Sequence, residues 1–103
     1  MNKKVKRISL KNVLKQQLKD SEFQFYFEQE KAIRRIARLI RDSRLKAGMT
    51  QAKLARQAQT NQTVIARLES GTDQRIPSLD LLERIAHALK AKLKVSFEYE
   101  TAV

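Results

Sequence analysis

The sequence predicts a small, mainly α-helical protein, because apolar residues recur at helical spacing along most of its 103 residues. Glycine occurs only twice and proline once, which argues against a β-sandwich and against long disordered linkers. Hydrophobic residues make up 42% of the chain, enough for one modest core. The chain has no cysteine, which excludes a disulfide framework, a thiolate metal site and a cysteine nucleophile.

The helical spacing begins near the N-terminus, at Leu10, Val13, Leu14 and Leu18. It predicts a short helix over about residues 10–19. We expect a break after it, because Ser21 with Gln24 three residues later has the pattern of a capping box. Amphipathic periodicity then continues to Gly48, a natural residue for a helix C-terminus. The pattern leaves open whether this second stretch is one helix or two.

Three further helices are expected, each preceded by a residue whose side chain can cap a helix: Thr50, Asn61 and Ser78. Gly71 marks the end of the second of these helices, and a polar loop separates it from the third. The expected inward-facing residues are Leu54, Ala55, Ala58, Val64, Ile65, Leu68, Leu79, Leu82, Ile85, Ala86 and Leu89.

The period of the pattern changes to two after the last helix. Apolar Leu93, Val95, Phe97 and Tyr99 alternate with polar residues, which predicts a short β-strand within residues 91–103. A lone strand leaves its backbone groups unpaired. We therefore expect it to pair with its twin in a homodimer or with a sheet of another protein; the alternative is pairing with residues 4–8.

The chain carries a net charge of +11, and the excess is clustered. Residues 1–21 hold seven Lys/Arg and one Asp, and residues 31–59 hold nine Lys/Arg and one Asp. Between them lies an acidic island of Glu22, Glu28 and Glu30. Clustered positive charge favours a nucleic-acid partner, because phosphate contacts release condensed counterions. The alternative is a solvated basic face that only keeps the protein soluble.

The helices after residue 48 have the organisation of a helix-turn-helix, two short helices joined by a three- to four-residue turn. Their parts are G-x-T-Q-x-x-L-A, a turn, T-V-I-A-R-L-E-S-G, a loop with proline, and L-x-x-L-x-x-I-A-x-A-L. In order and spacing, residues 32–90 resemble the Cro/phage-repressor class of helix-turn-helix domain. The resemblance implies a lambda-repressor-like helix-turn-helix bundle that binds a double-stranded DNA operator.

The resemblance also implies a set of DNA-binding residues, which are Thr50, Gln51, Asn61, Gln62, Thr63, Arg67, Gln74 and Arg75. Gln51 would bond a phosphate at the N-terminus of the scaffold helix, which itself attracts the anion. On the recognition helix, glutamine can pair with adenine, arginine with guanine, and threonine can contact the thymine methyl. Gln74 and Arg75 match backbone-phosphate contacts of the family.

Three features near these residues concern geometry. Arg44 and Glu69 match a family pair that forms an internal salt bridge, so we expect them to stabilise the fold and not to contact DNA. The family commonly has Glu where Lys53 stands. Lysine cannot accept a hydrogen bond from the backbone N–H of Thr50, so the second hydrogen bond of a capping box is missing. It also commonly has glycine where Gln59 stands, and a non-glycine residue in a left-handed turn costs about 1 kcal/mol.

The N-terminal third contains S-L-K-x-V-L-x-x-x-L-K-D-x-E-F-x-x-x-F-E, and K-L-K-V-S-F-E follows the last helix. Both patterns resemble the HigA-type antitoxins. This resemblance implies a dimer that represses its own operon and neutralises a small ribonuclease toxin of the RelE fold. Aromatic residues are common interface anchors, and the acidic island suits a basic partner. The candidate toxin-binding residues are Leu10, Leu14, Leu18, Phe23, Tyr26 and Phe27. The alternative is that these residues pack on the repressor core.

We therefore expect an N-terminal helical extension over residues 1–31, a DNA-binding domain over residues 32–90 and a C-terminal strand over residues 91–103. A stand-alone phage-type repressor without a toxin partner is the alternative function.

An enzyme is not expected, because the chain has no Gly-rich phosphate loop, no G-x-S-x-G elbow and no metal-ligand cluster. His87 is the only histidine, which excludes histidine-based zinc sites. We therefore expect no catalytic residues, no metal and no cofactor. There is no signal-peptide pattern and no apolar run near the ~20 residues that cross a bilayer. We expect a cytoplasmic protein without a membrane partner.

Overall fold

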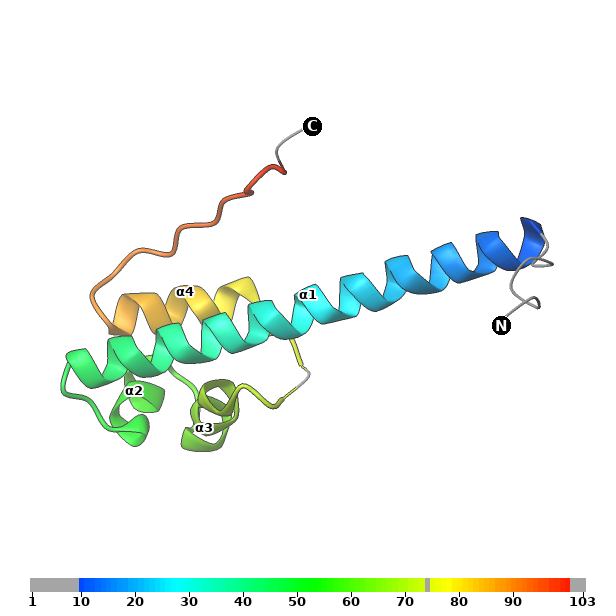
Figure 1. The fold of residues 1–103 in the computed structure, drawn as a ribbon. Helices are drawn as coiled ribbons and strands as arrows, with labels where there is room; N and C mark the ends of the chain where they lie inside the picture. The colour runs from blue at the N-terminus through cyan, green and yellow to red at the C-terminus, as the bar shows by residue number, and fades with distance from the viewer. Residues whose placement is uncertain (1–9, 74, 101–103) are drawn as a thin grey trace. The chain divides into compact units, whose positions relative to one another are not determined.

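Four helices make up most of the described part of the chain, residues 10–73 and 75–100 of a computed structural model. In chain order they are α1 (Leu10–Lys46), α2 (Gln51–Gln57), α3 (Gln62–Ser70) and α4 (Leu79–Ala88) (Figure 1). No strand is present among these described residues. The prediction of a mainly helical fold is therefore confirmed.

Helix α1 is continuous over 37 residues, so the predicted break near Ser21 is wrong. The helix contains no glycine or proline, and Asp20 accepts a hydrogen bond of 3.4 Å from Gln16 one turn earlier. Aspartate and serine each cost only about 0.5–0.7 kcal/mol in a helix interior, which is too little to stop a helix that continues on both sides. The helix ends where expected, since Gly48 adopts a φ of +69° just after it.

The chain divides into two compact units, Met1–Ala32 and Ile33–Val103. All buried residues of the described chain belong to the second unit: Ala37, Ile40, Leu54, Ala55, Ala58, Ile65, Ile85 and Ala88. Leu54 and Ile65 are fully buried, and burying a side chain of this size contributes about 1.5–3 kcal/mol. Every helix of the second unit thus supplies apolar side chains to its core.

Most of the predicted inward-facing residues are buried or partly buried, but Leu79 is 62% exposed, so its assignment is wrong. It is the first residue of α4, and the side chains of this helix that pack on the core begin two residues later, at Leu81. The helical period alone does not reveal where along a helix the core starts.

The three predicted N-caps are confirmed. The side chains of Thr50, Asn61 and Ser78 accept hydrogen bonds from the backbone N–H three residues later, at 3.0, 3.0 and 3.1 Å. Each bond satisfies one of the backbone donors that the first turn of a helix leaves without a partner. The caps fix where α2, α3 and α4 begin.

The strand expected after α4 is not formed in the described part of that segment, residues 91–100. A strand needs a second strand for its backbone hydrogen bonds, and the described chain supplies none. The alternative partner, residues 4–8, lies outside the described residues, as do residues 101–103. Without a partner strand, the side chains of Val95, Phe97 and Tyr99 are 67%, 84% and 88% exposed.

Candidate nucleic-acid interface

Helices α2 and α3 are joined by a tight turn, and their facing side chains are buried. Leu54 and Ala55 of α2 and Ile65 of α3 are at most 2% exposed. The small side chain of Ala55 leaves room for a close approach of neighbouring chain, and its carbonyl accepts a 2.8 Å hydrogen bond from the N–H of Thr60. The turn and the packing together hold α3 in a defined position against α2.

The turn contains a strained residue, as the sequence suggested. Gln59 has a φ of +58°, in the left-handed region that glycine adopts most easily. The carbonyl oxygens of Ala58 and Gln59 each accept a 2.8 Å hydrogen bond from Nη1 of Arg84 in α4. Asp80, one turn earlier in α4, accepts a 3.0 Å bond from Nε of the same arginine. Arg84 therefore holds the turn from the opposite helix.

Sequence reasoning missed Arg84. The only sequence signal was the Asp80–Arg84 spacing of four residues, which brings two opposite charges together on one helix face. Such pairs are common on surfaces, so the spacing does not reveal a contact with a turn 25 residues away.

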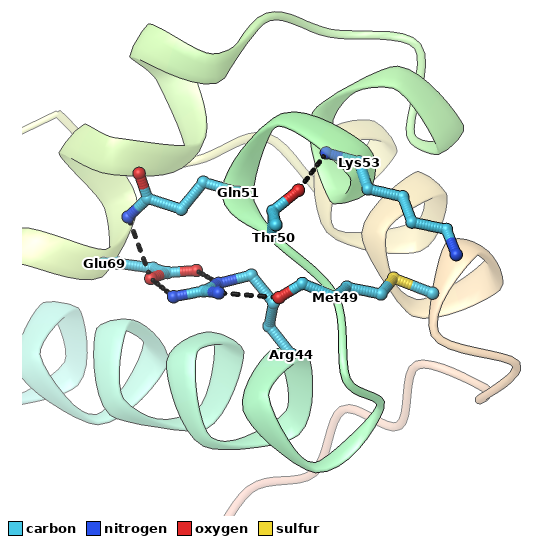
Figure 2. Close-up of polar contacts among 6 residues, drawn as sticks. All are labelled: Arg44, Met49, Thr50, Gln51, Lys53 and Glu69. Carbon is cyan, nitrogen blue, oxygen red and sulfur yellow. Dashed lines mark hydrogen bonds and ion pairs between the residues drawn. The ribbon is translucent and has the colours of Figure 1, made fainter.

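A largely buried ion pair lies at the N-terminal end of α2 and the C-terminal end of α3 (Figure 2). Arg44 of α1 donates two hydrogen bonds to the carboxylate of Glu69, at 2.6 and 2.9 Å, and a third of 2.8 Å to the carbonyl of Met49. The side chains of Arg44 and Glu69 are only 12% and 4% exposed. This is the expected internal salt bridge, with the two-pronged geometry in which arginine binds carboxylates most strongly.

The ion pair also shifts the pKa values of Glu69 and Arg44 so that both side chains stay charged. Burial raises the pKa of Glu69, but hydrogen bonds from Arg44 and Gln51 and the nearby arginine charges outweigh it, so the pKa lies below its ordinary value. The bond to Glu69 raises the pKa of Arg44 against the effect of burial. Both groups are therefore charged at neutral pH.

Gln51 joins this network, which limits its predicted contact with phosphate. Its side-chain Nε2 donates a 3.2 Å hydrogen bond to Glu69 (Figure 2). One side-chain N–H and the backbone N–H at the start of α2 remain for an anion. The bond to Glu69 also orients the amide, since the carboxylate can accept only from its nitrogen.

The predicted base-reading residues lie on the outer side of α3. Gln62, Thr63 and Arg67 are exposed, whereas Ile65 is fully buried and Leu68 is partly buried. Thr63 and Arg67 are four residues apart, so they share one face of the helix. Polar groups capable of reading base edges are thus presented on a helix whose other face is locked into the core.

The remaining predicted DNA-binding residues have different environments. Asn61 and Thr50 are exposed but use their side chains as caps. Arg75 is exposed in the loop after α3, where its backbone N–H donates a 3.0 Å hydrogen bond to Asp73. Gln74 lies outside the described residues.

Glycine is favoured at Gly71, where α3 ends. Its φ is +69°, and a Cβ atom at this position would lie 3.4 Å from the Cβ of Ala37. The end of α3 therefore passes close to α1, beside the exposed arginines Arg38 and Arg41. The exposed arginines of α1 therefore lie beside the C-terminal end of α3.

The candidate toxin-binding residues lie in the N-terminal part of α1. Five of them are exposed: Leu10, Leu14, Phe23, Tyr26 and Phe27, by 74%, 52%, 70%, 63% and 44%. Leu18 belongs to the helix, but its side chain lies outside the described residues. The rings of Phe23 and Phe27 stack with centroids 6.3 Å apart, and Nζ of Lys31 lies 4.7 Å from the Phe27 centroid. The sequence did not single out Phe25, which is 59% exposed and meets Tyr26 edge to face.

Comparison with known proteins adds one finding. The sequence model of the helix-turn-helix family matches residues 40–95, more than half of the chain. Neither the curated proteins nor the solved structures contain a significant match. Within the described residues, none of the helices has the length and apolar character needed to cross a membrane. The matched range contains the α2–turn–α3 unit, its ion pair and α4, and the chain therefore belongs to the Cro/C1-type helix-turn-helix family of DNA-binding transcription regulators.

Proposed function

We propose that this protein is a HigA-type antitoxin. In this proposal it represses its own operon as a dimer through α2 and α3, and it neutralises a RelE-fold ribonuclease through the N-terminal part of α1. The chain itself catalyses no reaction. The observation that carries the proposal is the cluster of exposed aromatic rings between Phe23 and Phe27, which a minimal DNA-binding domain does not need.

The chemistry of this cluster fits a basic protein partner. Aromatic rings supply large contact areas at little entropic cost and are frequent anchors of interfaces. The acidic residues Glu22 and Glu28 are exposed in the same stretch, in a chain whose other segments are basic or neutral. A ribonuclease that binds RNA carries positive charge on its surface, so these carboxylates would favour its association with the antitoxin.

The toxin part is tested by co-expression with the candidate ribonuclease encoded beside the antitoxin gene. The wild-type chain should restore growth, and Phe23→Ala with Phe27→Ala should abolish the rescue while the fold and DNA binding stay unchanged. Leu39→Ala is the matched control, because Leu39 is also an apolar residue of α1 and is 64% exposed. If no neighbouring ribonuclease binds while the promoter is still bound, the stand-alone repressor replaces the antitoxin.

The DNA part is tested on the promoter of the protein's own operon. Arg67→Ala should weaken specific binding by about 1–3 kcal/mol and relax the preference at one base pair. Arg56→Ala is a control, because Arg56 is an exposed arginine of α2 outside the predicted contact set. An unchanged footprint and affinity of Arg67→Ala would exclude Arg67 as a base-reading residue.

A further inference from the structure

The segment after α4 has a symmetric arrangement of charge about Ser96. Two lysines, Lys92 and Lys94, precede it at alternate positions, and two glutamates, Glu98 and Glu100, follow it at alternate positions. The residues between them are apolar: Leu93, Val95, Phe97 and Tyr99. When the segment is read in the opposite direction, as an antiparallel copy presents it, each lysine position is occupied by a glutamate and each apolar position stays apolar.

The same segment is free to pair. Residues 92–100 make no backbone hydrogen bonds with other described residues, and Val95, Phe97 and Tyr99 are 67–88% exposed. Unpaired backbone groups beside exposed apolar side chains form a template for another strand. The charge pattern identifies which strand fits.

We propose that residues 92–100 pair antiparallel with the same residues of a second copy of this chain, around a two-fold axis through Ser96. Lys94 then lies opposite the partner's Glu98, and Lys92 opposite the partner's Glu100. By symmetry the interface contains four such opposite-charge pairs on one face. On the other face Val95 meets the partner's Phe97, a β-branched–aromatic pair of the kind that stabilises sheets.

Other registers fit less well. A parallel, in-register pairing sets lysine beside lysine and glutamate beside glutamate, and like charges directly opposite each other are destabilising. An antiparallel shift by one residue puts apolar side chains opposite charged ones. A shift by two residues, with the axis at Val95 or Phe97, keeps only two of the four opposite-charge pairs. The register centred on Ser96 is thus the one that the sequence favours most.

This inference specifies the interface of the dimer in the proposed function and rests on that dimer, but its test needs neither DNA nor toxin. The chain contains no cysteine, so a single introduced thiol is unique. Residues directly opposite in an antiparallel pair have Cα atoms about 4.5–5.5 Å apart, within the range that a disulfide spans. Ser96→Cys in the full chain should therefore cross-link to its own copy under mild oxidation.

Two further variants fix the register. Lys94→Cys and Glu98→Cys should each fail to cross-link alone, because each thiol lies about 13 Å from its own copy along the strands. Mixed together, they should form a disulfide-linked heterodimer. Equal cross-linking of all single variants, or none by Ser96→Cys, would overturn the proposed pairing.

A charge exchange tests the cause of the pairing. The double variants Lys92→Glu/Lys94→Glu and Glu98→Lys/Glu100→Lys should each raise the dimer dissociation constant about tenfold or more, and their mixture should dimerise again. The helix content measured by circular dichroism should be unchanged in both, since no residue of this segment is in the core. The melting temperature is not a suitable control, because dimerisation itself raises it. If the first double variant dimerises as well as the wild type, or if cross-links form only to other proteins, the second copy is not the occupant. Loss of repression with cross-linking intact would count against the proposed function alone.

Discussion

Helix α1 contains two regions with the same periodicity and opposite environments. From Ile33 onward its apolar stripe is covered, and Ala37 and Ile40 are each 4% exposed. Before that point the apolar residues are solvated, and Phe23 and Tyr26 are 70% and 63% exposed. The comparison teaches that helical periodicity predicts a face but not what covers it. In the helix-turn-helix unit the chain itself covers that face, whereas in the N-terminal unit we propose that a partner does.

The largest effect should distinguish covered from uncovered residues directly. Ile65→Ala removes a fully buried side chain and should lower the free energy of unfolding by about 2–5 kcal/mol. Phe23→Ala removes a larger but exposed ring and should change it by no more than about 0.5 kcal/mol. Urea unfolding of both variants measures the difference. A large loss for Phe23→Ala would show that the ring belongs to a core.

The ion pair should give the next largest effect, because it is the main polar contact inside the covered region. Glu69→Gln leaves Arg44 without its carboxylate at a site where the two side chains are 12% and 4% exposed. We expect a loss of about 2–3 kcal/mol in the free energy of unfolding. Glu28→Gln is the matched control, since Glu28 pairs with Lys31 at 3.5 Å on the surface. Equal losses in the two variants would show that the largely buried pair contributes no more to stability than the exposed one.

The pH dependence of stability sharpens the same contrast. The pKa of Glu69 is lower in the folded protein than its ordinary value of 4.5, so its charged form stabilises the fold above about pH 4.5. This contribution should be lost as the pH falls through the folded-state pKa. The wild type should therefore lose stability on acidification more steeply than Glu69→Gln. Parallel curves from thermal unfolding between pH 6 and pH 3 would contradict this assignment.

The sequence predicted features that depend on neighbours in the chain, and it missed those that depend on distant or external groups. The caps at Thr50 and Asn61 and the left-handed glycine at Gly71 follow from local chemistry. The break at Ser21 was wrong, because a local capping pattern cannot stop a helix when continuing it costs so little. The C-terminal strand was expected but is absent from the described residues, since the hydrogen bonds of a ladder must come from another strand.

In the predicted DNA site, too, the sequence predicted the local features and missed the long-range contacts. The pattern of α3 was sufficient to predict that Thr63 and Arg67 share an exposed face while Ile65 is buried. Sequence alone did not reveal that Gln51 bonds Glu69, or that Arg84 reaches the turn, because both contacts depend on how helices distant in sequence pack. The base contacts themselves remain predictions.

The smallest effect concerns the turn, where a strained residue and its support can be separated. Gln59→Gly removes a left-handed strain of about 1–2 kcal/mol and adds a backbone entropy cost of about 0.5–1 kcal/mol. The strain term is larger, so a net stabilisation of about 0.5 kcal/mol is expected, whereas Gln59→Ala keeps the strain and should bring none. If Arg84 holds the turn, the gain from glycine should be smaller in an Arg84→Met background, because without its two hydrogen bonds the turn can relax and Gln59 leaves the left-handed region. Urea unfolding of the double-mutant cycle measures this difference, and identical gains in the two backgrounds would show that Arg84 does not support the turn.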